Sequence, residues 1–363
     1  MLRLEPRREP SQAMVYATPF IAVALTLAAG FLLFAGLGRD PFQAMFLIFV
    51  KPLLSLNGIA ELTVKATPLV LIATGLAVGF RAGVWNIGAE GQFTIGALTG
   101  GSVALAVYPA GGVWLLPLMM LAGILGGMAW AAIPALLRTR FNANEILVSL
   151  MLSYVAVLLL SLLVHGILRD PEGANFPESR LFQDSGLIPN LISGTRAHFG
   201  ALAALLAVAA TQVLLSRHLA GYQVKVLGMA PRAARFAGFS ESRIVWGCFL
   251  LSGGLAGLAG LIEAAGPVGQ LVPSLPVGYG FTAIIVAFLG RLHPVGILFA
   301  GLLIGLTYIG GETAQIAMRL PSATISIFQG LLLFFLLASD VLVRFRPVWR
   351  TERPAPVTPK PAE

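Results

Sequence analysis

The chain has 363 residues, of which 57% are hydrophobic and only 11% are charged, and its mean hydropathy is +0.86. Soluble domains carry about 25% charged residues. The composition therefore excludes a water-soluble globular protein and predicts an all-α polytopic membrane protein. The net charge of +8 also raises nucleic-acid binding as an alternative, which depends on where the cations lie.

The apolar segments, taken in chain order, predict a transmembrane domain over residues 15–345. At roughly 20 residues per span, there are about ten of them. Their cores are residues 15–37, 59–79, 88–108, 114–137, 146–166, 199–216, 244–264, 279–290, 295–311 and 323–343. The first is too long for the apolar region of a signal peptide, so we expect an uncleaved anchor behind a cytoplasmic tail, residues 1–14.

The remaining segments predict loops, an interfacial helix and a tail. Residues 42–56 contain a Lys and a Pro and favour an interfacial helix. Residues 167–198 form the longest outer loop, either an ordered cap or a plain connector. Residues 217–243 form a long cytoplasmic loop, and residues 346–363 are polar and Pro-rich, so we expect a disordered cytoplasmic tail.

The cations are distributed unequally between the two ends of the predicted spans. If both termini are cytoplasmic, the cytoplasmic side receives Arg3, Arg7, Arg8, Arg81, Arg138, Arg140, Arg217, Lys225, Arg232, Arg235, Arg243, Arg291, Arg344, Arg346, Arg350, Arg353 and Lys360. This is the positive-inside bias of membrane proteins. It favours an even span count and argues against a nucleic-acid partner.

A polar island interrupts the apolar pattern at residues 80–101, "FRAGVWNIGAEGQFTIGALTGG". It holds Asn86, Glu90 and Gln92. A charged side chain at mid-bilayer costs roughly 2.5–3.5 kcal/mol on insertion scales. One interpretation is a broken helix that lines the protein interior. The other is a cytoplasmic elbow, with Glu90 paired with Arg81 or capping the next helix.

A second island begins the fifth predicted span. Asn142 or Asn144 can cap this helix, and Glu145 is favourable in its first turn. Ser149 and Ser153 are spaced i, i+4 and share one face. That face serves either helix packing or a wet pathway.

The seventh predicted span carries small residues and one isolated acid. Gly253 with Gly257, and Ala256 with Gly260, have the spacing that brings helix backbones close together in lipid. We interpret these as packing faces. Glu263, near the outer end, lies either in an outward vestibule or at the interface.

The cytoplasmic loop at residues 217–243 contains "PRAARFAGF", which predicts a short helix. Pro231 suits the first helical position and Gly238 suits the stop. Arg232 and Arg235 then share one face, with Phe236 beside them. A short basic helix of this kind suits docking to another protein, and anchoring to lipid headgroups is the alternative.

Several chemistries are absent from the sequence. No lysine follows a glycine, so a Walker A motif cannot be written. The four histidines have no metal-ligand spacing, and Cys248 is the single cysteine. No nucleophile and base pair is apparent, so we expect no enzymatic activity and no bound metal.

Three segments together resemble a known family: "FRAGVWNIGAEGQFTIGA", "FNANEILVSLMLSYVA" and "GYQVKVLGMAPRAARFAGFS". They are similar to hallmark segments of the branched-chain amino acid, ribose and nucleoside permeases of bacterial ABC importers. Their wording is closest to the nucleoside (purine-type) and simple-sugar branch, and they occur in family order.

The resemblance implies a vitamin B12-importer-like (type II) fold of about ten helices, with both termini inside. It implies a multi-pass protein of the bacterial inner membrane that works with an ABC ATPase subunit, a second permease subunit expected to be a paralogue, and an extracytoplasmic solute-binding protein. The chain itself would bind no cofactor, because ATP is used by the partner, and membrane lipid surrounds it.

The resemblance also assigns residues. It makes residues 217–243 a cytoplasmic coupling loop, with an ATPase-coupling helix at Gly228, Pro231, Arg232, Ala234, Arg235 and Gly238. It places the broken helix of the translocation pathway at Asn86, Gly88, Glu90, Gly91 and Gln92, and the second island adds the candidates Asn144, Glu145, Ser149 and Ser153. The expected function is uptake of nucleosides or related small polar solutes. Simple sugars, branched-chain amino acids and an ion-coupled secondary transporter are the alternatives.

Overall fold

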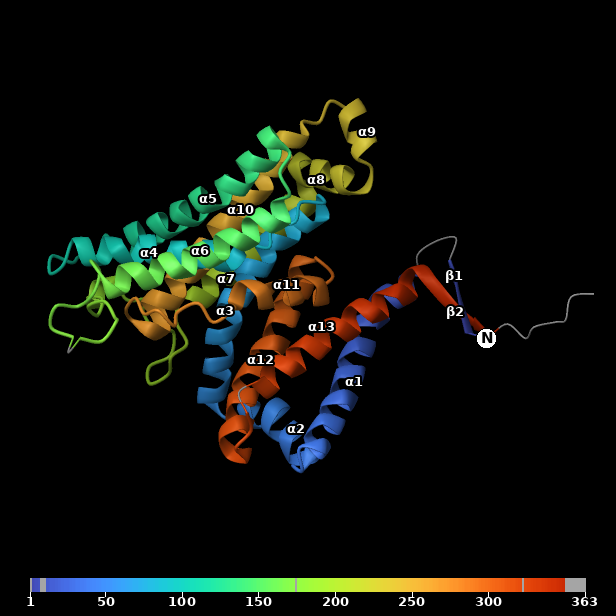
Figure 1. Cartoon of the computed structure of the whole chain (residues 1–363), viewed down its shortest axis with the longest axis horizontal. Coiled ribbons are helices and arrows are strands. Elements are labelled where there is room, and N and C mark those ends of the chain that lie inside the picture. The colour runs from blue at the N-terminus through green and yellow to red at the C-terminus, as the bar shows by residue number, and fades with distance from the viewer. Residues whose placement is uncertain (1, 7–10, 174, 322, 350–363) are drawn as a thin grey trace, which may run out of the picture. The chain divides into compact units, whose positions relative to one another are not determined.

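The computed structural model describes residues 2–6, 11–173, 175–321 and 323–349, and its chain divides into two compact units. Unit 1 comprises Met1–Pro41 and Ser326–Glu363, and unit 2 comprises Phe42–Ile325. Helices make up nearly all of the described secondary structure (Figure 1), so the predicted all-α polytopic class is confirmed.

Unit 1 joins the two ends of the chain. Helix α1 (Gln12–Gly36) starts at Ser11, whose hydroxyl accepts a hydrogen bond from the Met14 amide. Helix α13 (Ala323–Arg344) leads into strand β2 (Phe345–Trp349), which pairs antiparallel with β1 (Leu2–Pro6). The strand pair was not predicted. The predicted disordered tail begins at residue 346, whereas β2 continues to Trp349, and residues 350–363 lie outside the described part of the chain.

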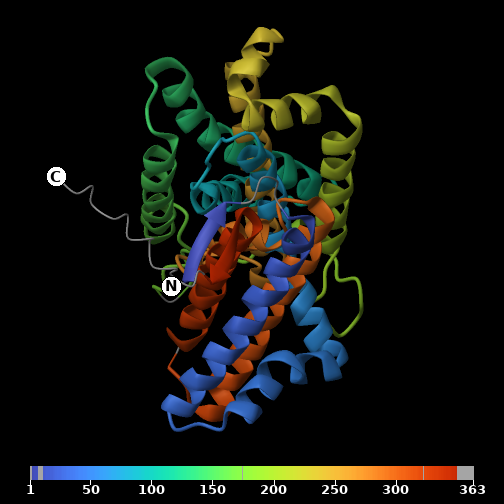
Figure 2. The same ribbon diagram turned by 90° about the vertical axis from the view of Figure 1, so that its right-hand side faces the viewer.

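Unit 2 contains the other helices. In chain order they are α2 (Pro41–Phe49), η1 (Lys51–Leu54), α3 (Leu56–Arg81), α4 (Ala89–Ala106), α5 (Leu115–Phe141), α6 (Glu145–His165), η2 (Asp184–Gly186), α7 (Gly200–Arg217), α8 (Leu219–Met229), α9 (Pro231–Phe236), α10 (Glu241–Glu263), the π-helical η3 (Ala264–Val268), α11 (Tyr279–Leu289) and α12 (Pro294–Met318). In Figure 2, α8 turns sharply away from the axis of α7 before α9 follows.

Each predicted span corresponds to one helix. Within the described residues, eight of these helices are long and apolar enough to cross a membrane. The remaining two predicted spans correspond to α4 and α11. Helix α11 has 11 residues, which gives a length of about 16 Å at 1.5 Å per residue. That is roughly half of the ~30 Å hydrocarbon core. The predicted interfacial segment, residues 42–56, is occupied by α2 and η1.

The core of unit 2 forms around α3 and α10, which are mostly buried. Helix α10 packs against α3, α4 and α5. A Cβ on Gly257 would overlap the Gly123 carbonyl oxygen of α5, and a Cβ on Gly260 would overlap the Phe93 carbonyl oxygen of α4. The predicted small-residue packing faces are therefore confirmed, because only glycine lets these backbones touch.

Replacing Gly257 by Ala should destabilise the protein, because an added methyl group in a filled interface costs about 1–3 kcal/mol. Thermal unfolding of the detergent-solubilised protein measures this. Gly247→Ala is the matched control on the same helix, since a Cβ there has no neighbour within 4 Å. Equal melting temperatures for the two variants would contradict the packing assignment.

The 167–198 loop is an ordered cap. Its backbone follows the segment after α10, with the Phe182 amide donating to the Gly269 carbonyl at 2.8 Å and the Ile188 amide donating to the Ala265 carbonyl at 2.9 Å. The Ser179 hydroxyl accepts from the Leu271 amide at 2.9 Å. This loop therefore fixes the irregular segment between α10 and α11.

His198 closes this cap as a buried neutral side chain. Its Nδ1 accepts from the Gly200 amide at 3.2 Å. Burial, with a smaller contribution from the charge of Arg196, lowers the pKa of His198 from 6.5 to about 4. The imidazole is therefore uncharged in the folded protein at pH values where it is already protonated in the unfolded chain.

The stability that His198 contributes should be present above pH 6.5 and should be lost as the pH falls towards 4, because protons bind the unfolded state more tightly. Melting temperatures at pH 7.5 and 5.0 test this. His198→Asn keeps an acceptor near the Gly200 amide but does not titrate, so its melting temperature should fall less. An equal fall in both proteins would contradict this role.

Candidate functional site

The first polar island forms a break between two helices. Helix α3 ends at Arg81, α4 begins at Ala89, and residues 82–88 between them are non-helical. Alternate residues of this stretch (Ala82, Val84, Asn86 and Gly88) are buried, whereas Gly83 and Trp85 are exposed. Irregular backbone at membrane depth is tolerated only inside protein or beside water, because its amides need partners. Both interpretations of this stretch stay predictions: its buried residues fit a broken helix in the protein interior, and the packing of the end of α3 against α8 fits a cytoplasmic elbow.

Asn86 organises this break. Its Nδ2 donates to Gln92 Oε1 and to Ser252 Oγ, both at 2.9 Å. Its Oδ1 accepts from the Gly88 amide at 3.0 Å and from Gln92 Nε2 at 3.1 Å. Asn86, Gln92 and Ser252 are all at most 2% exposed. The cluster therefore ties the extended segment to α4 and to α10.

The serine face of α6 supplies further partners for the same break. Ser149 Oγ accepts from the Ile87 amide at 3.1 Å, and Ser153 Oγ accepts from the Gly91 amide at 3.3 Å. A Cβ on Gly91 would lie 2.7 Å from the Ser153 Cα. This geometry favours helix packing for the serine face. Its participation in a wet pathway stays a prediction.

Glu90 caps a helix that is distant in the sequence. Its two carboxylate oxygens accept from the Gly278 amide at 2.7 Å and from the Gly280 amide at 2.5 Å, at the first turn of α11. The negative charge lies at the positive end of the helix dipole. The alternative pairing with Arg81 is wrong, because Arg81 Nε donates to the Leu292 carbonyl at 2.9 Å.

Two glycines make the Glu90 contact possible. Gly278 has a φ of +90°, which L side chains rarely adopt. Gly280 packs so closely that a Cβ would lie 2.6 Å from the Glu90 Cα. The sequence analysis did not identify Gly278, Gly280 or Ser252 as residues of this site. The glycine pair around Tyr279 in "VGYG" was the available signal, because it precedes a short apolar run.

Asn144 and Glu145 make local contacts at the start of α6. Asn144 is the N-cap, and its Oδ1 accepts from the Ile146 amide at 3.0 Å. Asn142 instead ends α5 in the left-handed conformation, with a φ of 52°. Glu145 pairs with Arg138 of α5 at 2.5 Å. The structure does not bring these two residues into the Asn86 cluster.

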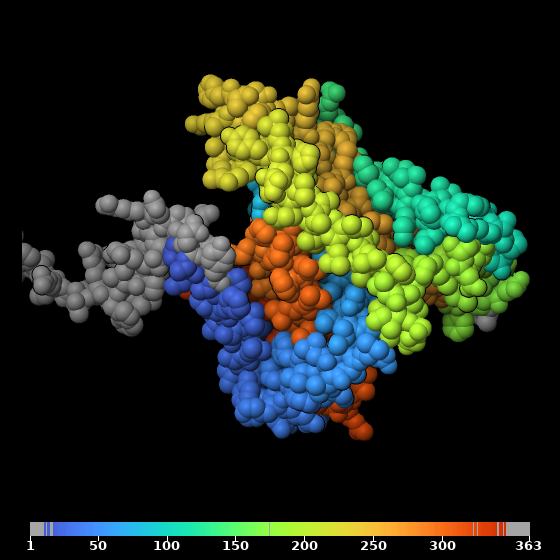
Figure 3. Space-filling view, turned by 180° about the vertical axis from the view of Figure 1, so that it is seen from behind, coloured from blue at the N-terminus to red at the C-terminus, as the bar shows by residue number. Residues whose placement is uncertain are grey.

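The coupling loop folds into α8 and α9, which protrude from the rest of unit 2 (Figure 3). Pro231 starts α9 and Gly238 follows it with a φ of +76°. The predicted docking residues divide into two groups. Arg232 and Arg235 are exposed, whereas Ala234 is fully buried.

Further contacts hold this segment in place. A Cβ on Gly228 would overlap the Arg81 carbonyl oxygen, so the end of α8 packs against the end of α3. Arg235 also pairs with Glu241 of α10 at 3.2 Å. Phe236 is 95% exposed beside the arginines, and the segment therefore presents an apolar ring flanked by cations.

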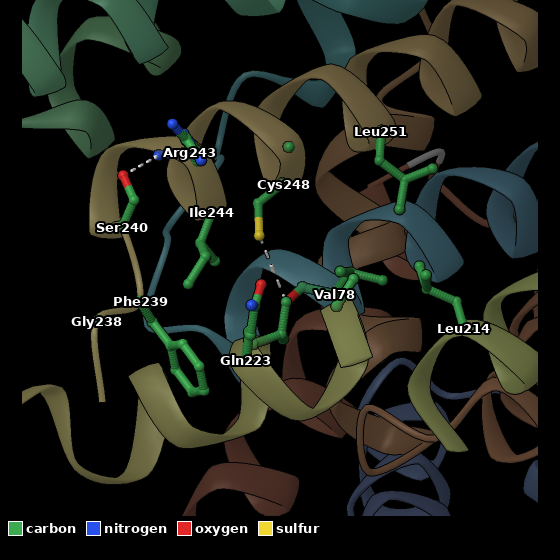
Figure 4. Close-up of a pocket in the computed structure, with 13 residues that line it drawn as sticks. Val78, Leu214, Gln223, Gly238, Phe239, Ser240, Arg243, Ile244, Cys248 and Leu251 are labelled. Atoms are coloured by element: carbon green, nitrogen blue, oxygen red, sulfur yellow. Dashed lines mark hydrogen bonds between the residues drawn. The ribbon is translucent and has the colours of Figure 1, made fainter. Parts of the chain in front are cut away.

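A cavity of about 300 Å³ lies between α8 and α10, beside the coupling segment. Gln223 of α8 and Cys248 of α10 point into it (Figure 4), and the Cys248 thiol lies 4.0 Å from the Val78 carbonyl oxygen. The walls are otherwise mostly apolar. Because of this space, the contact between α8 and α10 is less extensive than the contact between α5 and α10.

Nothing in the described residues resembles a metal or nucleotide site. In that part of the chain, no cluster of three or more His, Cys, Asp and Glu side chains could hold a metal ion. What the fold offers instead is a polytopic helix bundle with a break between α3 and α4, a capped half-length helix, and an exposed basic segment on one end. These features fit a membrane protein of several spans that presents a docking segment at one end.

The chain belongs to the permease component family of branched-chain amino acid transport systems, whose model matches residues 58–337. The glucose ABC transporter permease protein TsgB13 of Haloferax volcanii is 39% identical over 356 residues, covering 95% of this chain and 93% of the relative. The guanosine ABC transporter permease protein NupP of Bacillus subtilis is 29% identical over 330 residues, covering 90% and 94%.

A further Haloferax volcanii relative, the permease protein TsgC13, is 30% identical over 254 residues, covering 69% of this chain and 75% of the relative. The chain is therefore a permease subunit of an ABC importer, as the three sequence segments predicted, and its relatives fit the nucleoside and simple-sugar branch. It is a multi-pass membrane protein and a transport component rather than an enzyme.

Replacing Glu90 by Gln should lower the free energy of unfolding by about 2 kcal/mol or more, because an NH₂ group would then face a buried backbone amide and the charged hydrogen bonds would be lost. Thermal unfolding in detergent measures the change. The control is Glu172→Gln, whose side chain is 88% exposed. A Glu90→Gln variant as stable as the control would contradict the capping role.

Proposed function

We propose that this chain forms half of the translocation pathway of an ATP-driven importer for nucleosides or related small polar solutes, including simple sugars. The observation that carries the proposal is the exposed α9 segment, with Arg232, Arg235 and Phe236, on a chain whose sequence has no nucleotide-binding loop. Relatives named for glucose and for guanosine support the solute classes. The family description also includes branched-chain amino acids.

Docking of an ABC ATPase at α9 is physically reasonable. Exposed aromatic and arginine side chains are the residues that most often anchor protein interfaces. Phe236 supplies an apolar anchor and the two arginines supply directional donors. Ala234 and Gly228 would act from the inner side, by holding the segment on the bundle. ATP would be hydrolysed on the partner, and this chain would hold no cofactor.

The other partners follow from the same architecture. TsgB13 and TsgC13 occur in one organism and both match this chain, which supports a paralogous second permease subunit. An extracytoplasmic solute-binding protein would dock at the opposite end of the bundle, where the 167–198 loop forms its cap. The cation asymmetry supports cytoplasmic termini and a place in the bacterial inner membrane.

An ion-coupled secondary transporter has less support. Such a protein would need a carboxylate in mid-membrane that is available to an ion or a proton. Glu90 and Glu263 were the candidates. Both oxygens of Glu90 are engaged with the first turn of α11, which leaves Glu263 as a single carboxylate with an oxygen that has no partner in the described residues. An ATP-driven importer needs no carboxylate of this kind.

Charge reversal at α9 tests the coupling assignment. The double variant Arg232→Glu, Arg235→Glu should insert normally but lose uptake by tenfold or more, because hot-spot losses are about 2 kcal/mol or larger. Uptake of radiolabelled guanosine, glucose and leucine is measured separately in cells that express the chain with its partner subunits.

The matched control is Arg140→Glu, Arg217→Glu, which reverses two exposed arginines at the ends of α5 and α7. It should retain uptake. Normal transport by the α9 variant would contradict docking at this segment. Entry of leucine alone would leave the importer assignment intact and exclude the nucleoside and sugar classes.

A further inference from the structure

Glu263 carries a carboxylate oxygen without a partner. The residue is only 8% exposed. Its Oε1 accepts from the Tyr279 hydroxyl at 3.4 Å, whereas no donor in the described residues reaches its buried Oε2. Buried polar atoms are nearly always hydrogen-bonded, and an unsatisfied ionised group is costly. The other buried acid, Glu90, has partners on both oxygens, so Glu263 needs a different explanation.

The neighbours of Glu263 form a cluster of polar and aromatic groups from four helices. The Tyr279 ring is fully buried and lies edge-on to the Tyr308 ring, with a centroid distance of 6.0 Å. The hydroxyl groups of Tyr308 and Thr282 are 2.9 Å apart. Lys65 Nζ lies 6.0 Å from the centroid of the Tyr279 ring. The cluster thus combines acceptors, donors and ring faces.

This cluster extends from the buried Glu263 towards the protein surface, near the capped end of the bundle. Lys65 pairs with Glu312 at 3.7 Å, and their side chains are 24% and 53% exposed. Exposure therefore rises stepwise from Glu263 through Lys65 to Glu312. Glu263 ends α10 two residues before Ala265, where the 167–198 loop binds. The cluster lies at the end opposite α9.

Lys65 and Glu312 compensate one another, so Glu263 is the group of the cluster whose hydrogen bonding a ligand would complete. The unpartnered oxygen of Glu263 needs a hydroxyl or amide donor. A carboxylate that accepts from a ring hydroxyl is the way in which dinucleotide-binding proteins recognise ribose, and aromatic side chains suit the apolar face of a sugar ring.

We propose that Glu263 and Tyr279, with Lys65 and Glu312 at the rim, recognise the vicinal hydroxyls of a furanose or pyranose ring as the solute passes. This inference rests on the proposed importer function and deepens it. It explains how one fold serves relatives named for glucose and for guanosine, because a hexose and a ribonucleoside share a vicinal diol. Leucine lacks that group.

The test compares guanosine with 2′-deoxyguanosine, which lacks the vicinal diol. The complex of this chain with its permease and ATPase partners is purified without the solute-binding protein, so that the permease alone discriminates. Ligand-induced shifts in melting temperature give apparent affinities. The wild-type complex should bind guanosine about tenfold more tightly than 2′-deoxyguanosine, which is the effect of losing one charged hydrogen bond.

The Glu263→Gln and Tyr279→Phe variants should reduce this preference towards one. Glu61→Gln, a nearby acid that has its own partner in Arg196, is the control and should keep the wild-type preference. The preference is a ratio within one variant, so it does not depend on how much protein folds. A Glu263 that acts as a neutral structural group would tolerate Gln and leave the ratio unchanged.

The outcomes separate the two proposals. A wild-type ratio near one, or an unchanged ratio in either variant that still binds, overturns the diol site. If neither variant yields folded protein, the wild-type ratio decides alone. Cells that take up none of these solutes, although the complex assembles, would instead overturn the proposed function.

Discussion

The contact between the Glu90 carboxylate and the first turn of α11 is the constraint on which the interior of unit 2 depends. A helix that begins inside the bundle exposes amides that water would otherwise satisfy. Glu90 accepts from two of them and places a negative charge at the positive end of α11. These bonds hold the start of α4 against the start of α11. Gly280 packs directly on the Glu90 backbone, so the two helix ends fit in this position without room for a side chain between them.

The same physical requirement explains most polar residues of the first two islands. Asn86, Ser149 and Ser153 each accept a hydrogen bond from a backbone amide at the helix break, and all three are buried. Polar side chains within these spans therefore mainly support irregular backbone. The Glu263 cluster differs, because one carboxylate oxygen of Glu263 has no partner in the described protein. In our proposal, this oxygen accepts a hydrogen bond from a solute hydroxyl.

Hydropathy was sufficient to place every predicted span on a helix, and local rules identified the Asn144 cap and the limits of α9. These features depend on neighbouring residues or on composition. The partner of Glu90 could not be predicted, because Gly278 lies 188 residues away and nothing local distinguishes a distant amide from Arg81. The β1–β2 pair likewise joins opposite ends of the chain. The residue pattern within either segment does not identify the other segment as its pairing partner.

The short length of α11 has a consequence for biogenesis. A segment of 11 residues is too short for the translocon to release as an independent span, which takes about 20 apolar residues. Helix α11 would therefore enter the bilayer only as part of a hairpin with its longer neighbours, α10 and α12. Glu90, made much earlier in synthesis, would wait in the membrane without its amide partners until that hairpin docks. During synthesis, Glu90 would therefore be a carboxylate without its hydrogen-bond partners until α11 is inserted.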